Sequence, residues 1–81
     1  MKLYVLRPLS NLKPDPWHDW YDLYHGFVVR AETEQRAREL CAEQDKLNST
    51  SKYWLDARYV ECYELSYDGA ERIILSDYRA G

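Results

Sequence analysis

The sequence predicts an α+β domain of two layers, in which an antiparallel sheet of three to four strands carries one main helix on one face. One segment, residues 34–46, consists almost entirely of strong helix formers. A chain of 81 residues is the length of a single domain, so we assign residues 1–81 to one domain. Short runs that are β-branched or alternate between apolar and polar residues predict strands at residues 3–6, 27–31, 59–65 and 71–75.

The first strand and the main helix have clear boundary signals. Pro8 cannot donate a hydrogen bond to a strand partner, so the first strand ends before it. Thr33 is a good N-cap for the helix at 34–46. The helical period places Ala37, Leu40, Cys41 and Gln44 on the inner stripe and Glu34, Arg38, Glu39, Glu43 and Lys46 in solvent.

The third strand alternates in a way that defines two faces of the sheet. Val60 and Cys62 form a small apolar face, which would bring Cys62 toward Cys41 of the helix. Tyr59, Glu61 and Tyr63 would occupy the opposite face, which an aromatic segment must cover or leave open. Asp68-Gly69 then predicts a hairpin turn into the fourth strand, at residues 71–75.

The most unusual stretch of the chain is the aromatic segment at residues 15–26, which contains four large rings, three aspartates and both histidines. Asp15 and Pro16 are suited to the N-cap and first position of a helix, and Gly26 is suited to its C-terminal cap. The sequence leaves two alternatives for this segment: a short helix over residues 16–24, or an irregular aromatic loop. The rings lie at i, i+3, i+4 and i+7, the spacing of one helical face: Trp17, Trp20, Tyr21 and Tyr24.

The charge of the chain is mildly acidic, with 14 Asp and Glu against 11 Lys and Arg. This balance argues against direct binding of nucleic acid, whose phosphates the aspartates beside the rings would repel. An acidic, aromatic surface suits a host protein or ribonucleoprotein complex with a basic groove. Alternatively, the rings close the open face of the sheet, or some of them are buried there while others remain at the rim. The candidate partner-binding residues are Asp15, Trp17, Asp19, Trp20, Tyr21, Asp22 and Tyr24.

Catalytic and metal-binding patterns are weak. His18, Asp22 and His25 lie at i, i+4 and i+7, which on a helix would offer two imidazoles and a carboxylate to a metal. We favour the other interpretation, a solvated polar face with an ion pair between His18 and Asp22. No serine has the flanking glycines of a nucleophile elbow. We therefore expect a protein that is not an enzyme and has no catalytic residue, bound metal or cofactor.

The cysteines and the apolar runs bear on localisation. Cys41 and Cys62 have no metal-like spacing, and buried thiols are usually inert. The first residues form too short an apolar run for a signal peptide, and no segment approaches the roughly 20 apolar residues that span a bilayer. We expect a cytoplasmic protein, without membrane contact, that is a monomer or a homodimer.

Residues 24–40 (YHGFVVRAETEQRAREL), with WLD at 54–56 and ILSDY at 74–78, resemble small stand-alone α/β proteins of phages and mobile elements. Some of these are anti-CRISPR inhibitors. The resemblance implies an inhibitor of a type I system, such as type I-C, in the host bacterial cytoplasm. Such an inhibitor binds a Cascade-type complex of Cas subunits and guide RNA and blocks target DNA binding as a DNA mimic. The other hypotheses are a phage structural or assembly adaptor acting as a homodimer, and a small metal-dependent enzyme.

Overall fold

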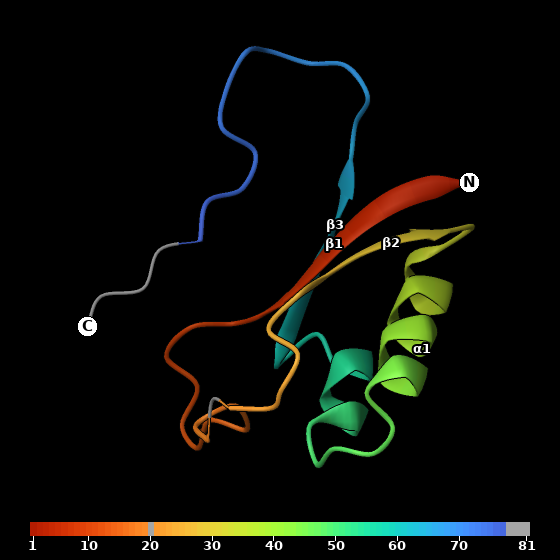
Figure 1. Ribbon diagram of the computed structural model, residues 1–81. Coiled ribbons are helices and arrows are strands. Elements are labelled where there is room, and N and C mark those ends of the chain that lie inside the picture. The colour runs from red at the N-terminus through yellow and green to blue at the C-terminus, as the bar shows by residue number, and fades with distance from the viewer. Residues whose placement is uncertain (20, 78–81) are drawn as a thin grey trace.

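Three antiparallel strands and one main helix form the framework of the protein, as predicted (Figure 1). The computed structural model describes residues 1–19 and 21–77. Strand β1 spans Lys2–Pro8, β2 spans Phe27–Ala31 and β3 spans Val60–Leu65. Helix α1 spans Glu34–Gln44, and a short 3₁₀ helix, η1, spans Ser51–Leu55. The strand order is β2-β1-β3, so the first strand is the central one, and α1 and η1 lie on the same side of the sheet.

The strand register determines which side chains share a face of the sheet. Leu6 pairs with Phe27 and Cys62, whereas its neighbour Val5 pairs with Val28 and Tyr63. Because side chains alternate along a strand, the Leu6 set faces α1 and the Val5 set faces away from it. We call the side facing α1 the inner face and the opposite side the outer face. The buried core contains Tyr4, Leu6, Trp17, Ala31, Ala37, Cys41, Trp54 and Val60.

Helix α1 begins as predicted, but its buried face is rotated relative to the prediction. The Thr33 hydroxyl accepts a hydrogen bond from the Arg36 backbone N–H at 3.2 Å, which confirms the N-cap. Ala37 and Cys41 are buried as expected. However, Leu40 is 41% exposed and Gln44 is also exposed, so they were wrongly placed on the inner stripe.

Arg38, which was predicted to lie in solvent, is only 4% exposed. Its Nη1 donates to the backbone carbonyls of Trp54 and Val60, both at 3.0 Å, and its Nε lies 2.9 Å from a Glu34 carboxylate oxygen. The helical period alone could not reveal this arrangement, because η1 packs against that flank of α1. A guanidinium suits the position because it supplies several donors to carbonyls that would otherwise be buried without partners.

A buried carboxylate links the end of α1 to η1. Asp45 is 1% exposed, and its Oδ2 accepts hydrogen bonds from Trp54 Nε1 at 2.7 Å and Thr50 Oγ1 at 2.6 Å. Its Oδ1 accepts from Asn48 Nδ2 at 2.6 Å. Asp45 also caps the helix, since its backbone N–H donates to the Cys41 carbonyl at 3.0 Å. These bonds position Trp54, the largest buried residue beside α1.

The predicted fourth strand does not form: within residues 66–77, which the structure describes, no segment joins the sheet. The chain bends at Tyr67 and Asp68, so Asp68-Gly69 does not form a hairpin turn, and the Ser66 hydroxyl donates to the Asp68 carbonyl at 2.7 Å inside this bend. The bend carries the chain away from β3, and residues 70–77 return toward the outer face (Figure 1). Trp17 of the aromatic segment does not cover that face, because its ring belongs to the core on the inner face.

The helices in the described part of the chain are all too short or too polar to cross a membrane.

Candidate partner-binding loop

The aromatic segment is a loop stabilised by turns at the end of the sheet. Among its described residues, 15–19 and 21–26, no helix forms, so of the two alternatives the loop is the observed one. Asp15 accepts two local hydrogen bonds, one at Oδ1 from Trp17 N (2.9 Å) and one at its carbonyl from His18 N (3.1 Å). Asp22 has a φ of 61°, in the left-handed region, which a continuous right-handed helix excludes.

Trp17 fixes this loop to the core. Its side chain is 2% exposed and lies edge-on to Trp54, with ring centroids 5.5 Å apart. Its Nε1 donates to the Tyr24 carbonyl at 2.9 Å, so one indole ties both ends of the loop together. The structure therefore corrects the prediction that Trp17 contacts a partner. Its ring closes the core on the inner face, and not the open face of the sheet to which the alternative assigned the rings.

The other rings of the loop differ in exposure. Tyr21 is 82% exposed, which leaves its ring available as an interface anchor. Tyr24 is 39% exposed, stacks on Phe27 with centroids 4.9 Å apart, and accepts a hydrogen bond from Gln44 Nε2 at 2.9 Å. Tyr24 is thus held against the body of the protein with one edge in solvent. Trp20 lies outside the described residues.

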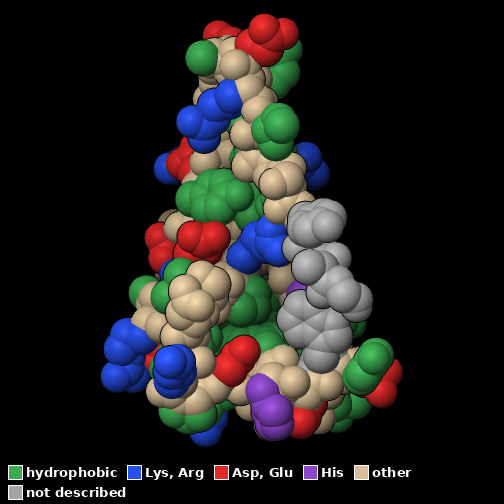
Figure 2. Space-filling view, turned by 90° about the vertical axis from the view of Figure 1, so that its left-hand side faces the viewer, with side chains coloured by type: hydrophobic (Ala, Val, Ile, Leu, Met, Phe, Trp, Pro, Cys, Tyr) green, Lys and Arg blue, Asp and Glu red, His purple; other side chains and the backbone are tan. Residues whose placement is uncertain are grey.

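The carboxylates of the loop all lie in solvent. Asp15 and Asp22 are exposed, and the Asp19 side chain is 79% exposed, with its Oδ1 3.0 Å from His18 Nε2. Figure 2 shows acidic side chains and a histidine at the lower end of the molecule, where this loop lies. We call the exposed residues Asp15, Asp19, Tyr21 and Asp22 the acidic edge.

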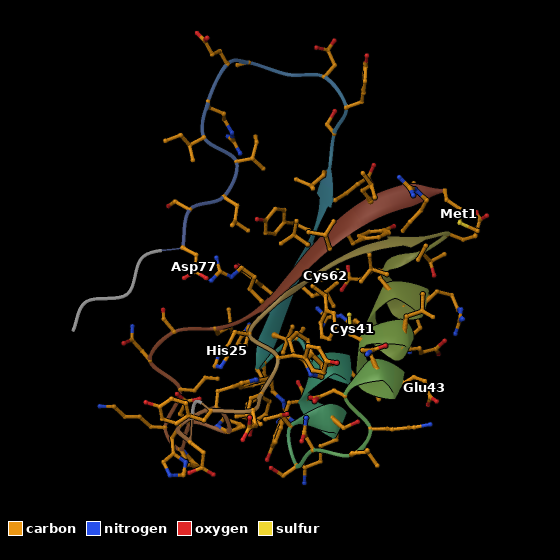
Figure 3. All side chains as sticks on the ribbon, viewed as in Figure 1. Met1, His25, Cys41, Glu43, Cys62 and Asp77 are labelled. Carbon is orange, nitrogen blue, oxygen red and sulfur yellow. The ribbon has the colours of Figure 1, made fainter. Side chains whose placement is uncertain are left out.

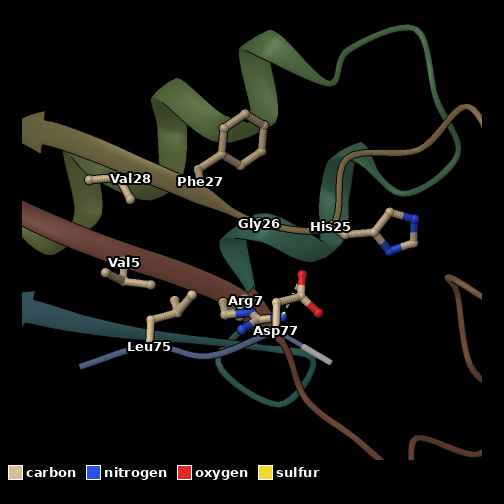
Figure 4. Close-up of a pocket in the computed structure, with 8 residues that line it drawn as sticks. All are labelled: Val5, Arg7, His25, Gly26, Phe27, Val28, Leu75 and Asp77. Carbon is tan, nitrogen blue, oxygen red and sulfur yellow. Dashed lines mark ion pairs between the residues drawn. The ribbon is translucent and has the colours of Figure 1, made fainter. Parts of the chain in front are cut away.

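The structure does not assemble the metal site that the histidine spacing suggested. Nowhere in residues 1–19 and 21–77 do three His, Cys, Asp or Glu side chains come together as a ligand set. His18, Asp22 and His25 would share a face only on a helix, and the loop replaces that helix. His25 instead lines a hollow on the outer face of the sheet (Figure 4).

The two cysteines lie between the sheet and α1, as the alternation of the third strand predicted (Figure 3). Burial raises the pKa of the Cys41 thiol to about 12, and its neighbour Cys62 contributes to the same shift. Burial also raises the pKa of Cys62, and the charge of Glu34 adds to this effect. Both groups therefore remain thiols at neutral pH, which makes them poor nucleophiles and metal ligands.

The raised pKa of Cys41 predicts how the stability of the protein changes at alkaline pH. The folded protein keeps the Cys41 proton above pH 9, its ordinary pKa, whereas the unfolded chain loses it. Unfolding is therefore favoured progressively as the pH rises from 9 toward 12. We expect urea denaturation between pH 7 and 10.5 to show a smaller alkaline loss of stability for Cys41→Ala than for the wild type. Equal losses would show that this thiol does not titrate differently in the two states.

Sequence patterns did not identify Arg7 as a residue of interest, although its alternation with Val5 places both on the outer face. Arg7 lines the same hollow as His25.

No protein-family model, curated protein or solved structure matches this chain.

Proposed function

We propose that this chain is a non-enzymatic inhibitor that docks its acidic edge on a basic surface of a larger complex. The observation that carries the proposal is the division of the loop into a buried anchor and an exposed edge. Trp17 is in the core, while Asp19 and Tyr21 project from the same loop into solvent. A loop held in this way loses little conformational entropy when a partner binds it.

The chemistry of the edge suits a groove that normally holds phosphates. The carboxylates of Asp15, Asp19 and Asp22 can each pair with a lysine or arginine of the partner. Tyr21 adds an amphipathic ring of the kind that anchors protein interfaces. Binding of this type weakens as salt rises, because the contributing charges lie at the surface.

For the partner, we propose a Cascade-type complex of a type I CRISPR system in the host bacterial cytoplasm. Lysine and arginine side chains of its Cas subunits would line a basic channel for target DNA alongside the guide RNA, and the acidic edge would occupy this channel as a DNA mimic. The sequence resemblance and the acidic edge support this assignment. Direct contact with nucleic acid is not expected, because the carboxylates repel phosphate.

The test is a gel shift in which a type I-C complex binds target DNA while this protein is titrated in. The variant is Asp19→Lys with Asp22→Asn, since asparagine tolerates the positive φ at position 22 better than lysine does. We expect it to need at least about tenfold more protein for half inhibition, because the edge loses two negative charges and gains one positive charge.

The matched control is Glu32→Lys with Glu71→Gln, which makes the same change in net charge. Both glutamates are exposed, and they lie in the turn from β2 to α1 and in the segment after β3, away from the loop (Figure 1). We expect this control to inhibit like the wild type. Equal inhibition by the two variants would remove the acidic edge as the docking site, and no inhibition by the wild type would refute the proposed partner.

A further inference from the structure

The outer face of the sheet is partly covered by the described residues that follow β3. Val5 and Arg7 of β1 and Val28 of β2 belong to this face, and Leu75 and Asp77 lie beside them (Figure 4). Val5 is 2% exposed, although α1 and η1 both lie on the opposite side of the sheet, whereas Val28 beside it is 64% exposed. Residues 70–77, which we call the C-terminal segment, thus shield only part of the face.

Two residues of the C-terminal segment, Leu75 and Asp77, line one hollow together with residues of the sheet. Leu75 lines it together with Val5 and Val28, which form an apolar wall. At the other end, Arg7 Nη1 donates to the Ser76 carbonyl at 3.5 Å, and Arg7 Nη2 lies 3.7 Å from Asp77 Oδ2. The hollow therefore holds an apolar side chain and, two positions later, a carboxylate. We call it the outer hollow.

This occupancy is weak and incomplete. Both Arg7 contacts are long, and the Asp77 side chain is 48% exposed, so this ion pair contributes little to stability. Leu75 is 46% exposed, and a cavity of about 340 Å³ remains in the outer hollow. Ile73 and Ile74 are 82% and 50% exposed, which is unfavourable for apolar side chains. A tighter occupant could displace the C-terminal segment at small cost.

We propose that the outer hollow is a docking site for an extended segment of a partner protein, in which a large apolar side chain precedes a carboxylate by two positions. The chain's own Leu75 and Asp77 occupy this site in the free protein and act as an internal competitor. The positive charge of Arg7 selects a carboxylate on the partner segment, and the apolar wall of Val5 and Val28 selects the apolar side chain that precedes it. The cavity left beside Leu75 favours a larger residue, such as phenylalanine. This site is separate from the acidic edge and does not depend on its function.

The experiment uses a labelled peptide with the sequence of residues 71–77, ERIILSD, and the full chain in three forms. Leu75→Ser with Asp77→Ser weakens the internal competitor, and we expect this variant to bind the peptide at least about fivefold more tightly than the wild type, because tethered competition is removed. A peptide carrying Leu75→Phe should bind more tightly still. The third form adds Arg7→Gln, which keeps part of the side-chain stem, to the variant with the weakened competitor. We expect it to bind the peptide at least about threefold more weakly than that variant does.

Three outcomes would overturn the proposal. The first is equal peptide binding by the wild type and by the variant with the weakened competitor. The second is binding that does not change with Arg7→Gln or with an asparagine in place of the peptide carboxylate. The third is concentration-dependent dimerisation of the wild type that Asp77→Arg abolishes, since this would assign the outer hollow to a second copy of the chain. Far-UV circular dichroism confirms that each variant is folded.

Discussion

Replacing Trp17 with alanine is expected to lower the free energy of unfolding by about 3–5 kcal/mol. The substitution removes a side chain that is 2% exposed and packs against Trp54 and Tyr53. It also removes the hydrogen bond from Nε1 to the Tyr24 carbonyl, which closes the loop. Small domains are stable by only about 5–15 kcal/mol, so a large part of the stability would be lost. Urea denaturation at neutral pH measures the change.

The control for Trp17 is another ring of the same loop. Tyr21 is 82% exposed, so Tyr21→Ala should change the free energy of unfolding by no more than about 0.5 kcal/mol. The two variants together separate the anchor from the exposed edge. A cost below about 1 kcal/mol for Trp17→Ala would mean that the indole is not in the core, and the basis for a preorganised loop would be lost.

The Asp45→Ala substitution is expected to cost about 2–4 kcal/mol of stability. It leaves the Trp54 Nε1–H and the Thr50 hydroxyl without their acceptor in a buried site. Asp45→Asn should cost less, because an amide oxygen can accept both bonds while Asn48 reorients its own amide. Thermal unfolding of the three proteins provides the comparison. Equal losses for alanine and asparagine would show that the carboxylate charge, and not the acceptor geometry, stabilises the site.

Local signals in the sequence were sufficient to predict three strands and the main helix. Thr33 and the helix formers after it mark α1, and the β-branched residues 27–31 mark β2, because these preferences act within a few residues. The two faces of β3 also follow from simple alternation for Cys62 and Tyr63. Tyr59 is the exception: it precedes the strand and packs beside Tyr53 in the core, with ring centroids 4.5 Å apart.

The errors arose where distant parts of the chain determine the outcome. Arg38 is buried because η1 and β3 present carbonyls to it, and neither element is visible from the helical period of α1. Residues 71–75 have strand-forming side chains, but strand propensity forms a strand only where a partner edge is in reach. The bend at Tyr67 and Asp68 directs them elsewhere.

The candidate loop shows the same limit. The ring spacing indicated a helical face, but the Asp15 turn and the left-handed Asp22 determine an irregular path. Of the predicted partner-binding residues, the structure places Asp15, Asp19, Tyr21 and Asp22 in solvent and Trp17 in the core. Composition could show that rings and acids cluster here, but only the tertiary packing shows which of them a partner can reach.

Carboxyl footprinting of the free protein and of its mixture with a type I-C surveillance complex tests the central claim most directly. A carbodiimide with an amine converts exposed carboxylates to amides, and mass spectrometry gives the rate at each residue. The account predicts strong protection of Asp19 and Asp22 by the complex, while Glu32 and Glu71 react as in the free protein. Unchanged rates at Asp19 and Asp22 would contradict it, whether or not other carboxylates were protected.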